Sequence, residues 1–191
     1  MHFRKTLISI SILIFILVSG CKKKSEQISQ TSDVKQKLSE YGFFEGKLSD
    51  LSPRADVLPY DLNTPLFTDY AHKSRFVWMP KGSSATYTTD HVLEFPKGTV
   101  LIKNFYYYHD ERKPEQGKRI IETRLMINND KGWEVLTYVW NKEQTEAQFD
   151  KAGDILPVSW VNNDGKEMTI QYIIPNKNQC KSCHTYKGKF T

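Results

Sequence analysis

Residues 119–140 read RIIETRLMINNDKGWEVLTYVW, and this stretch decides the fold class. Two runs rich in β-branched and aromatic residues, 119–127 and 133–140, flank a short segment of Asn, Asp, Lys and Gly. Runs of this kind favour strands, and the segment between them favours a tight turn. Strands joined by so short a turn pair antiparallel. The second run is apolar on both faces, which predicts a central, buried strand.

Strand and turn signals recur on both sides of this stretch. Further strands are predicted at 75–79, 87–95, 99–107, 147–149, 157–161 and 167–174. In the last of these, Met168, Ile170, Tyr172 and Ile174 alternate onto one face. A short N-terminal helix is expected from residue 33 until Gly42 ends it. The sequence therefore predicts a mostly β fold, an antiparallel β-sandwich or barrel-like domain over residues 33–175.

The first 21 residues have the pattern of a bacterial lipoprotein leader. Two cations precede an apolar run at 7–18, which is shorter than the about 20 residues that span a membrane. Val18-Ser19-Gly20-Cys21 follows and resembles the lipobox, whose Cys receives diacylglycerol. We expect a signal peptide at 1–20, a lipid anchor on Cys21 and a polar tether at 21–32. An uncleaved anchor helix is the alternative.

The location of the positive charge argues against nucleic-acid binding. The net charge of +5 equals the five cations Arg4, Lys5, Lys22, Lys23 and Lys24, so residues 25–191 carry no net charge. A nucleic-acid-binding domain needs a basic face. The three lysines after Cys21 instead favour contact with anionic lipid headgroups. The predicted partner of this end of the chain is a membrane.

Residues 180–184 read CKSCH, the C-x-x-C-H signature of covalent c-type haem attachment. On one helical turn, Cys180 and Cys183 face the same way and can add to the two vinyl groups of haem. His184 then lies where it can bind the iron as the proximal ligand. Export agrees with this interpretation, because bacterial haem ligation occurs outside the cytoplasm. The predicted cofactors are haem c and its iron.

Other interpretations of the two cysteines stay open or lack support. A disulfide between Cys180 and Cys183 is possible in an oxidising compartment. A thioredoxin-like pair needs a βαβ context, and a zinc site needs four ligands, and the sequence offers neither. For the sixth position on the iron, His72, His91 and His109 are candidates, although each fits a surface or packed histidine as well.

Several segments together resemble a family of exported bacterial proteins with an N-terminal β-rich domain and a C-terminal c-type cytochrome domain. The resemblance covers roughly residues 40–184 and rests on 60–71 (YDLNTPLFTDYA), 95–105 (FPKGTVLIKNF), 122–125 (ETRL), 138–141 (YVWN) and 178–184 (NQCKSCH). It implies haem binding and electron transfer. The family continues well beyond the motif, so residues 176–191 are expected to be the start of a truncated cytochrome c domain with a helical stub.

The sequence thus predicts a lipid-anchored c-type haem protein that transfers electrons with a redox partner protein. Its expected place is the cell envelope of a bacterium, on the outer membrane facing the periplasm or the surface. The alternative is a non-redox β-sandwich binding module with a vestigial haem motif, which the abundant Tyr and Trp favour. No G-x-S-x-G, H-E-x-x-H or Gly-rich phosphate loop occurs in the sequence, so no enzyme is predicted.

Overall fold

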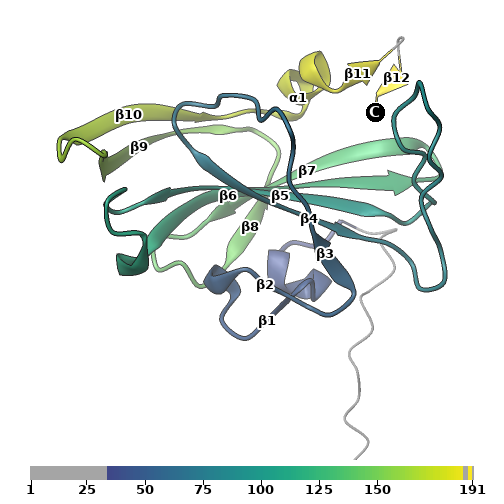
Figure 1. Cartoon of the computed structure of the whole chain (residues 1–191), viewed down its shortest axis with the longest axis horizontal. Helices are drawn as coiled ribbons and strands as arrows, with labels where there is room; N and C mark the ends of the chain where they lie inside the picture. Colours follow the sequence, from purple (N-terminus) through teal and green to yellow (C-terminus); the bar gives the residue numbers. More distant parts are fainter. Residues whose placement is uncertain (1–33, 187–188, 191) are drawn as a thin grey trace, which may run out of the picture.

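The computed structural model describes residues 34–186 and 189–190. The predicted signal peptide at 1–20, the tether at 21–32 and the lipid anchor on Cys21 lie outside these residues and stay predictions. The described part contains a β-rich body followed by one short α-helix, α1, near the C-terminal end (Figure 1).

The body is built on a six-stranded antiparallel sheet in the order β3-β4-β5-β6-β7-β8. Its strands are β3 (Val57–Pro59), β4 (His72–Trp78), β5 (Val100–Tyr108), β6 (Lys118–Asn129), β7 (Gly132–Trp140) and β8 (Ala147–Asp150). The spatial order follows the chain, so each strand pairs with the next one. The mostly β, antiparallel prediction is therefore confirmed. The barrel-like alternative is wrong, because β3 and β8 are the two edges of an open sheet.

The predicted hairpin at 119–140 forms β6 and β7, with Asn129 opposite Gly132. The side chain of Asn129 accepts a hydrogen bond of 2.9 Å from the backbone N–H of Lys131, which closes the turn. β7 is largely buried, as predicted, but it lies beside the edge strand β8 and not at the centre. β8 pairs only with Thr137–Trp140, so the first half of β7 is itself an edge.

The N-terminal segment covers one side of the sheet, here called the N-terminal face. It comprises η1 (Leu38–Tyr41), β1 (Phe44–Glu45), η2 (Leu48–Asp50) and β2 (Ser52–Pro53). Its residues Leu38, Tyr41 and Phe43 share one hydrophobic core with the sheet. The expected helix is a single 3-10 turn, which Gly42 ends with a φ of 69°. So short a segment gains its order from packing rather than from helix propensity.

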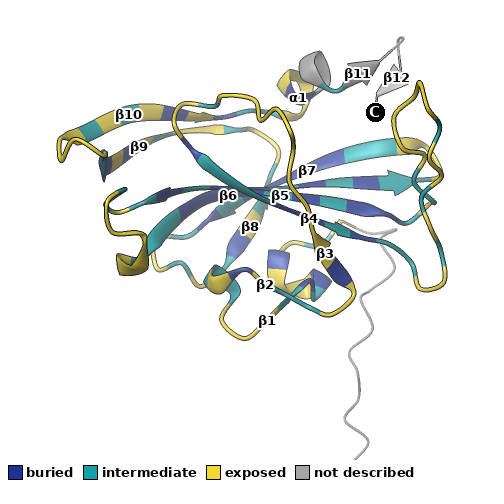
Figure 2. Ribbon diagram, in the orientation of Figure 1, coloured by how far each residue is buried: buried dark blue, intermediate teal, exposed yellow. Residues whose placement is uncertain are grey.

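A hairpin of β9 (Asp154–Val161) and β10 (Glu167–Ile174) covers part of the other side, here called the hairpin face. Val158, Trp160, Tyr172 and Ile174 pack with Phe105 of the sheet in a second core. Figure 2 shows buried segments in both the hairpin and the central strands. Along β10 the even-numbered residues are buried or half-buried and the odd-numbered residues are exposed, which confirms the predicted alternation. Because this layer is a single hairpin, the sandwich stays a prediction.

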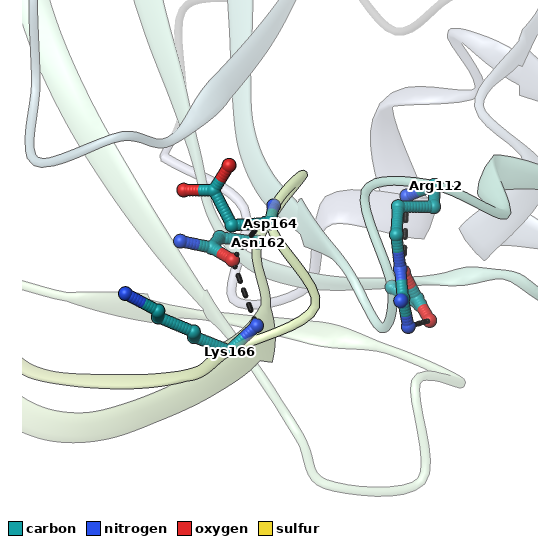
Figure 3. A network of polar contacts seen from close by, with 5 residues as sticks. Arg112, Asn162, Asp164 and Lys166 are labelled. Carbon is teal, nitrogen blue, oxygen red and sulfur yellow. Dashed lines mark hydrogen bonds and ion pairs between the residues drawn. The ribbon is translucent and has the colours of Figure 1, made fainter.

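A network of polar contacts organises the turn of this hairpin and the loop beside it (Figure 3). Asn162 Oδ1 accepts hydrogen bonds from the backbone N–H groups of Asp164 and Lys166, at 3.0 and 2.9 Å. After β5, Arg112 binds both carboxylate oxygens of Asp110, at 2.9 and 2.7 Å. A parallel bridge joins this loop to the end of β9. The hairpin is thereby held at a fixed place along β5.

Two further connections join neighbouring strands of the sheet. η3 (Pro114–Gln116) lies in the turn between β5 and β6, and the loop 79–99 joins β4 to β5. The predicted strand at 87–95 is wrong, because this loop forms only a single bridge between Thr86 and Glu94. Its apolar residues Tyr87, Val92 and Leu93 are exposed. Without a partner strand, β propensity alone does not form a strand.

Candidate haem-attachment site

The motif lies on α1 (Lys177–Cys183), directly after β10. Pro175 separates the two elements, since proline cannot continue the hydrogen-bond ladder. Asn176 caps the helix and accepts hydrogen bonds from the backbone N–H groups of Asn178 and Gln179, at 3.0 and 3.1 Å. The side chain of Gln179 accepts one of 2.9 Å from the N–H of Asn176, which completes a capping box. Local sequence therefore specifies where this helix begins.

The backbone brings the three motif residues onto one helical turn. Cys180 lies in α1, Cys183 is its last residue, and His184 is its C-cap, with its N–H donating to Cys180 O at 3.2 Å. Cys180 is buried and His184 is half-buried. The side chain of Cys183 lies outside what the structure describes. A thiol and an imidazole one turn apart suit thioether attachment and axial ligation of haem, so the described residues fit this group.

α1 lies at the edge formed by the open first half of β7, on the side of the sheet that the hairpin covers (Figure 1). Lys177 Nζ forms an ion pair of 2.8 Å with Glu134 Oε1 of β7. On β6, hydrogen bonds and the charge of Glu122 raise the pKa of Arg124 against the opposing effect of burial, and Cys180 adds to the rise. The Cys180 thiol therefore lies within electrostatic range of the Arg124 guanidinium.

Glu122 is a buried carboxylate beneath the hairpin. It accepts hydrogen bonds from Arg124 Nε at 2.8 Å and from Tyr172 Oη at 2.7 Å, and its other contact is with Arg124 Nη2. Burial, followed by the charge of Glu122, raises the pKa of Tyr172 far above its usual range. This network ties β10 to β6 at the point where the chain approaches α1.

Three cations lie side by side across the hairpin face, and we call Arg75, Lys103 and Arg124 the cation row. Arg75 of β4 pairs with Lys103 of β5, and Lys103 pairs with Arg124 of β6, so the three side chains share one face. Burial, followed by the charges of the neighbouring cations Arg124, Arg75 and Lys73, lowers the pKa of Lys103 to about 8. The sheet therefore carries concentrated positive charge on the side where α1 lies.

The three histidines named as candidate iron ligands are not gathered at the motif. His72 stacks on Tyr106 and contacts the Glu111 carboxylate at 2.9 Å, and its position along β4 directs it to the N-terminal face. His109 lies beside Gly117 in the β5–β6 turn, and His91 is exposed in the loop 79–99. Among the described residues, none of the three joins Cys180 and His184 in a group that could hold a metal ion.

Comparisons with known proteins add no assignment, since no family model, no curated protein and no solved structure matches the chain. Within residues 34–186 and 189–190, no helix is long and apolar enough to cross a membrane. Over the same residues, no group of three or more His, Cys, Asp or Glu side chains is arranged to hold a metal ion.

Sequence reasoning found the motif but missed the cation row. Arg75, Lys103 and Arg124 are separate basic residues in three strands, far apart along the chain. A weak signal existed, because each of the three lies in a predicted strand, where every second side chain faces the same side of the sheet. Strand register decides whether such residues become neighbours, and register depends on pairing across the sheet.

Proposed function

We propose that this protein is a c-type haem protein that transfers electrons at the bacterial cell envelope, with a lipid anchor on Cys21. The observation that carries the proposal is the C-x-x-C-H motif on the capped helix α1. Cys180 and Cys183 would form the two thioether bonds, and His184 would be the axial ligand. A covalently attached haem supplies a one-electron redox centre.

The contacts of α1 support this proposal because they give the motif a defined position. The capping box of Asn176 and Gln179 fixes the start of the helix, and the Lys177–Glu134 ion pair joins it to β7. Cys180 is buried against the body, so one attachment point is held by packing. A redox centre on a fixed element keeps its distance and orientation toward a partner protein.

The spectrum of the full chain made with a haem-ligation system tests the proposal. We expect a Soret band that survives acid–acetone extraction, because thioether bonds hold haem covalently. Cys180→Ser and Cys183→Ser should each lower the yield, and His184→Ala should remove most of the product. Folded wild-type chain without covalent haem would show that the proposal is wrong.

Cys21→Ser separates the anchor from the haem site. The variant should leave the membrane fraction while its covalent haem content stays at the wild-type level, since Cys21 lies far along the chain from the motif. A variant that stays membrane-bound and uncleaved would contradict the lipid anchor and favour an anchor helix.

A second candidate is a non-redox binding module of β-sandwich type. One observation favours it: the β3–β4 loop exposes large apolar side chains, with Leu66 and Phe67 at 68% and 66% exposure. Contiguous exposed apolar patches mark interaction sites in soluble proteins. A wild-type chain that binds a partner through this loop and carries no covalent haem would favour the module over the haem protein.

A further inference from the structure

The centre of the cation row lacks a neutralising group. Lys103 Nζ lies 5.0 Å from the centre of the Phe105 ring. Among the described residues, no hydrogen bond or ion pair reaches this ammonium, although it stands between two guanidinium groups on the neighbouring strands. Like charges held this close, and partly removed from water, destabilise one another unless an anion joins them.

Arg75 also has an unmet donor. Its side chain is 5% exposed, and its Nε is buried without a hydrogen-bond acceptor. Its ion pair is made by Nη1 with Asp61 at 3.0 Å, and the Asp61 side chain is 89% exposed. A buried guanidinium N–H without an acceptor costs free energy, so this atom is suited to an acceptor that comes from outside the described residues.

Glu122, the one buried carboxylate among the described residues, is already engaged. Glu122 uses both of its oxygens for Arg124 and Tyr172. Lys73, which faces the same side of β4, donates to the Leu66 carbonyl oxygen at 3.1 Å and brings no negative charge. The positive charge of Arg75 and Lys103 is therefore not balanced by the buried groups around it.

The row is bordered by apolar side chains on both sides along the strands. Val77, Leu101 and Met126 are the next cross-strand neighbours on the same face, and all three are half-buried. On the other side lies Phe105, which also contacts the Arg124 guanidinium, 4.4 Å from the ring centre. Cations framed by apolar groups suit a ligand that joins carboxylates to a large apolar body.

The cation row runs across the strands, away from the edge of the sheet where α1 lies. Arg124 lies on β6, directly beside β7, which α1 contacts, and Lys103 and Arg75 follow on strands progressively farther from β7. Neighbouring strands are about 4.8 Å apart, so the row spans about 10 Å. The propionates of haem leave the edge of the macrocycle opposite the edge that carries the vinyl groups.

We propose that Arg75, Lys103 and Arg124 form a carboxylate-binding site that receives the propionates of the haem attached at Cys180 and Cys183. This inference rests on the proposed function and extends it, because it assigns the far edge of the macrocycle to the hairpin face. Lys103 supplies an ammonium at the centre of the site, and Arg75 supplies the unmet Nε–H. The alternative occupant of this site is a small free carboxylate, which carries the same anionic group as a propionate.

The test compares the full haem-bearing chain with Lys103→Gln and Lys118→Gln. Lys118 is the matched control: its Nζ also lies over an aromatic ring, that of Tyr106 at 4.8 Å, and burial also lowers its pKa, but it faces the N-terminal side. The ferric Soret position, followed from about pH 4 to 9, reports propionate ionisation. We expect Lys103→Gln to raise the propionate pKa by about one unit or more, and Lys118→Gln to leave it unchanged.

The outcomes separate this inference from the proposed function. Covalent haem with the same titration in both variants and wild type overturns the propionate site and leaves the haem protein standing. If wild type carries no covalent haem, the proposed function fails, and the chain is titrated with glutarate by calorimetry. Glutarate binding that Lys103→Gln abolishes would overturn the propionate assignment in favour of a free carboxylate. No glutarate binding to such a chain would overturn the carboxylate site altogether.

Discussion

The hydroxyl of Tyr172 in β10 donates a hydrogen bond of 2.7 Å to the buried carboxylate of Glu122 in β6, 50 residues earlier in the chain. This contact joins the hairpin to the central sheet close to the start of α1. It also links the hairpin to the cation row, because Arg124 binds the same carboxylate. The position of the C-x-x-C-H motif thus depends on a polar contact inside the second core.

Tyr172→Phe should destabilise the protein. The variant removes one donor from the buried Glu122 carboxylate, which also pairs with Arg124, and hydrogen bonds to charged groups contribute about 1.5–3 kcal/mol. Urea unfolding of the full chain measures the change in the free energy of unfolding. Tyr87→Phe, at an exposed tyrosine, is the control and should have no measurable effect. Equal stability of the two variants would contradict the importance of this contact.

Thr123→Val tests a polar network on the N-terminal face. Thr123 Oγ1 donates to Asn104 Oδ1 at 2.7 Å and accepts from Trp140 Nε1 at 3.0 Å, and all three residues are buried. Valine would leave both partner atoms without this bond, at a cost of about 1–3 kcal/mol for each. Thr123→Ser keeps the hydroxyl and should lose much less in thermal unfolding. Similar losses of stability in the two variants would show that packing, and not the hydroxyl group, accounts for the effect.

Gly153→Ala should disturb the junction between β10 and α1. Gly153 has a φ of 77°, and an added Cβ would lie 2.5 Å from the Ile174 carbonyl oxygen and 3.0 Å from the Asn176 amide nitrogen. Gly46→Ala is the control, because Gly46 has a φ of 70° but no atom within 4 Å of its added Cβ. Strain of the backbone conformation is common to both variants. The excess loss of Gly153→Ala, about 1–3 kcal/mol in chemical unfolding, measures the collision.

In protein that carries no haem, Lys103 should make the free energy of unfolding increase with pH. Burial and neighbouring cations lower its pKa from the usual 10.5 to about 8. Below pH 8 the Lys103 ammonium is charged in both the folded and the unfolded state, and its destabilising effect on the folded state is largest. From pH 8 upward the folded state releases the proton first, the unfolded state binds more protons, and stability increases.

Lys103→Met isolates this effect. The variant lacks the titrating group, so the difference in the free energy of unfolding between it and wild type should shrink as pH rises from 8 toward 10. Urea unfolding at several pH values in this window measures the difference. A difference that stays constant with pH would show that the Lys103 ammonium titrates as it does in the unfolded chain.

Much of the β architecture follows from local sequence. The turn at Asn129–Gly132 and the runs on either side of it specify a hairpin, because turn chemistry and strand propensity act over a few residues. The alternation of Met168, Ile170, Tyr172 and Ile174 predicts which side of β10 is buried. The start of α1 is equally local, since Asn176 and Gln179 form its capping box.

The predicted strand at 87–95 and the predicted N-terminal helix failed for the same reason, because contacts between residues far apart in the sequence decided both structures. The run at 87–95 has strand-forming residues but no neighbouring strand, and hydrogen bonds to a neighbour are what stabilise a strand. The segment before Gly42 forms one 3-10 turn because Tyr41 packs inward, where its hydroxyl lies 2.8 Å from that of Tyr138. In both segments, contacts distant in sequence outweigh local propensity.

The sequence by itself determined the C-x-x-C-H motif, because the spacing of Cys180, Cys183 and His184 is a property of one helical turn. Only the tertiary structure decided what surrounds that motif. The pairing of β4, β5 and β6 places Arg75, Lys103 and Arg124 side by side, and a register shift of one residue would have turned them to opposite faces. Helical spacing is set within the chain segment, whereas register is set by the burial of both faces of the sheet at once.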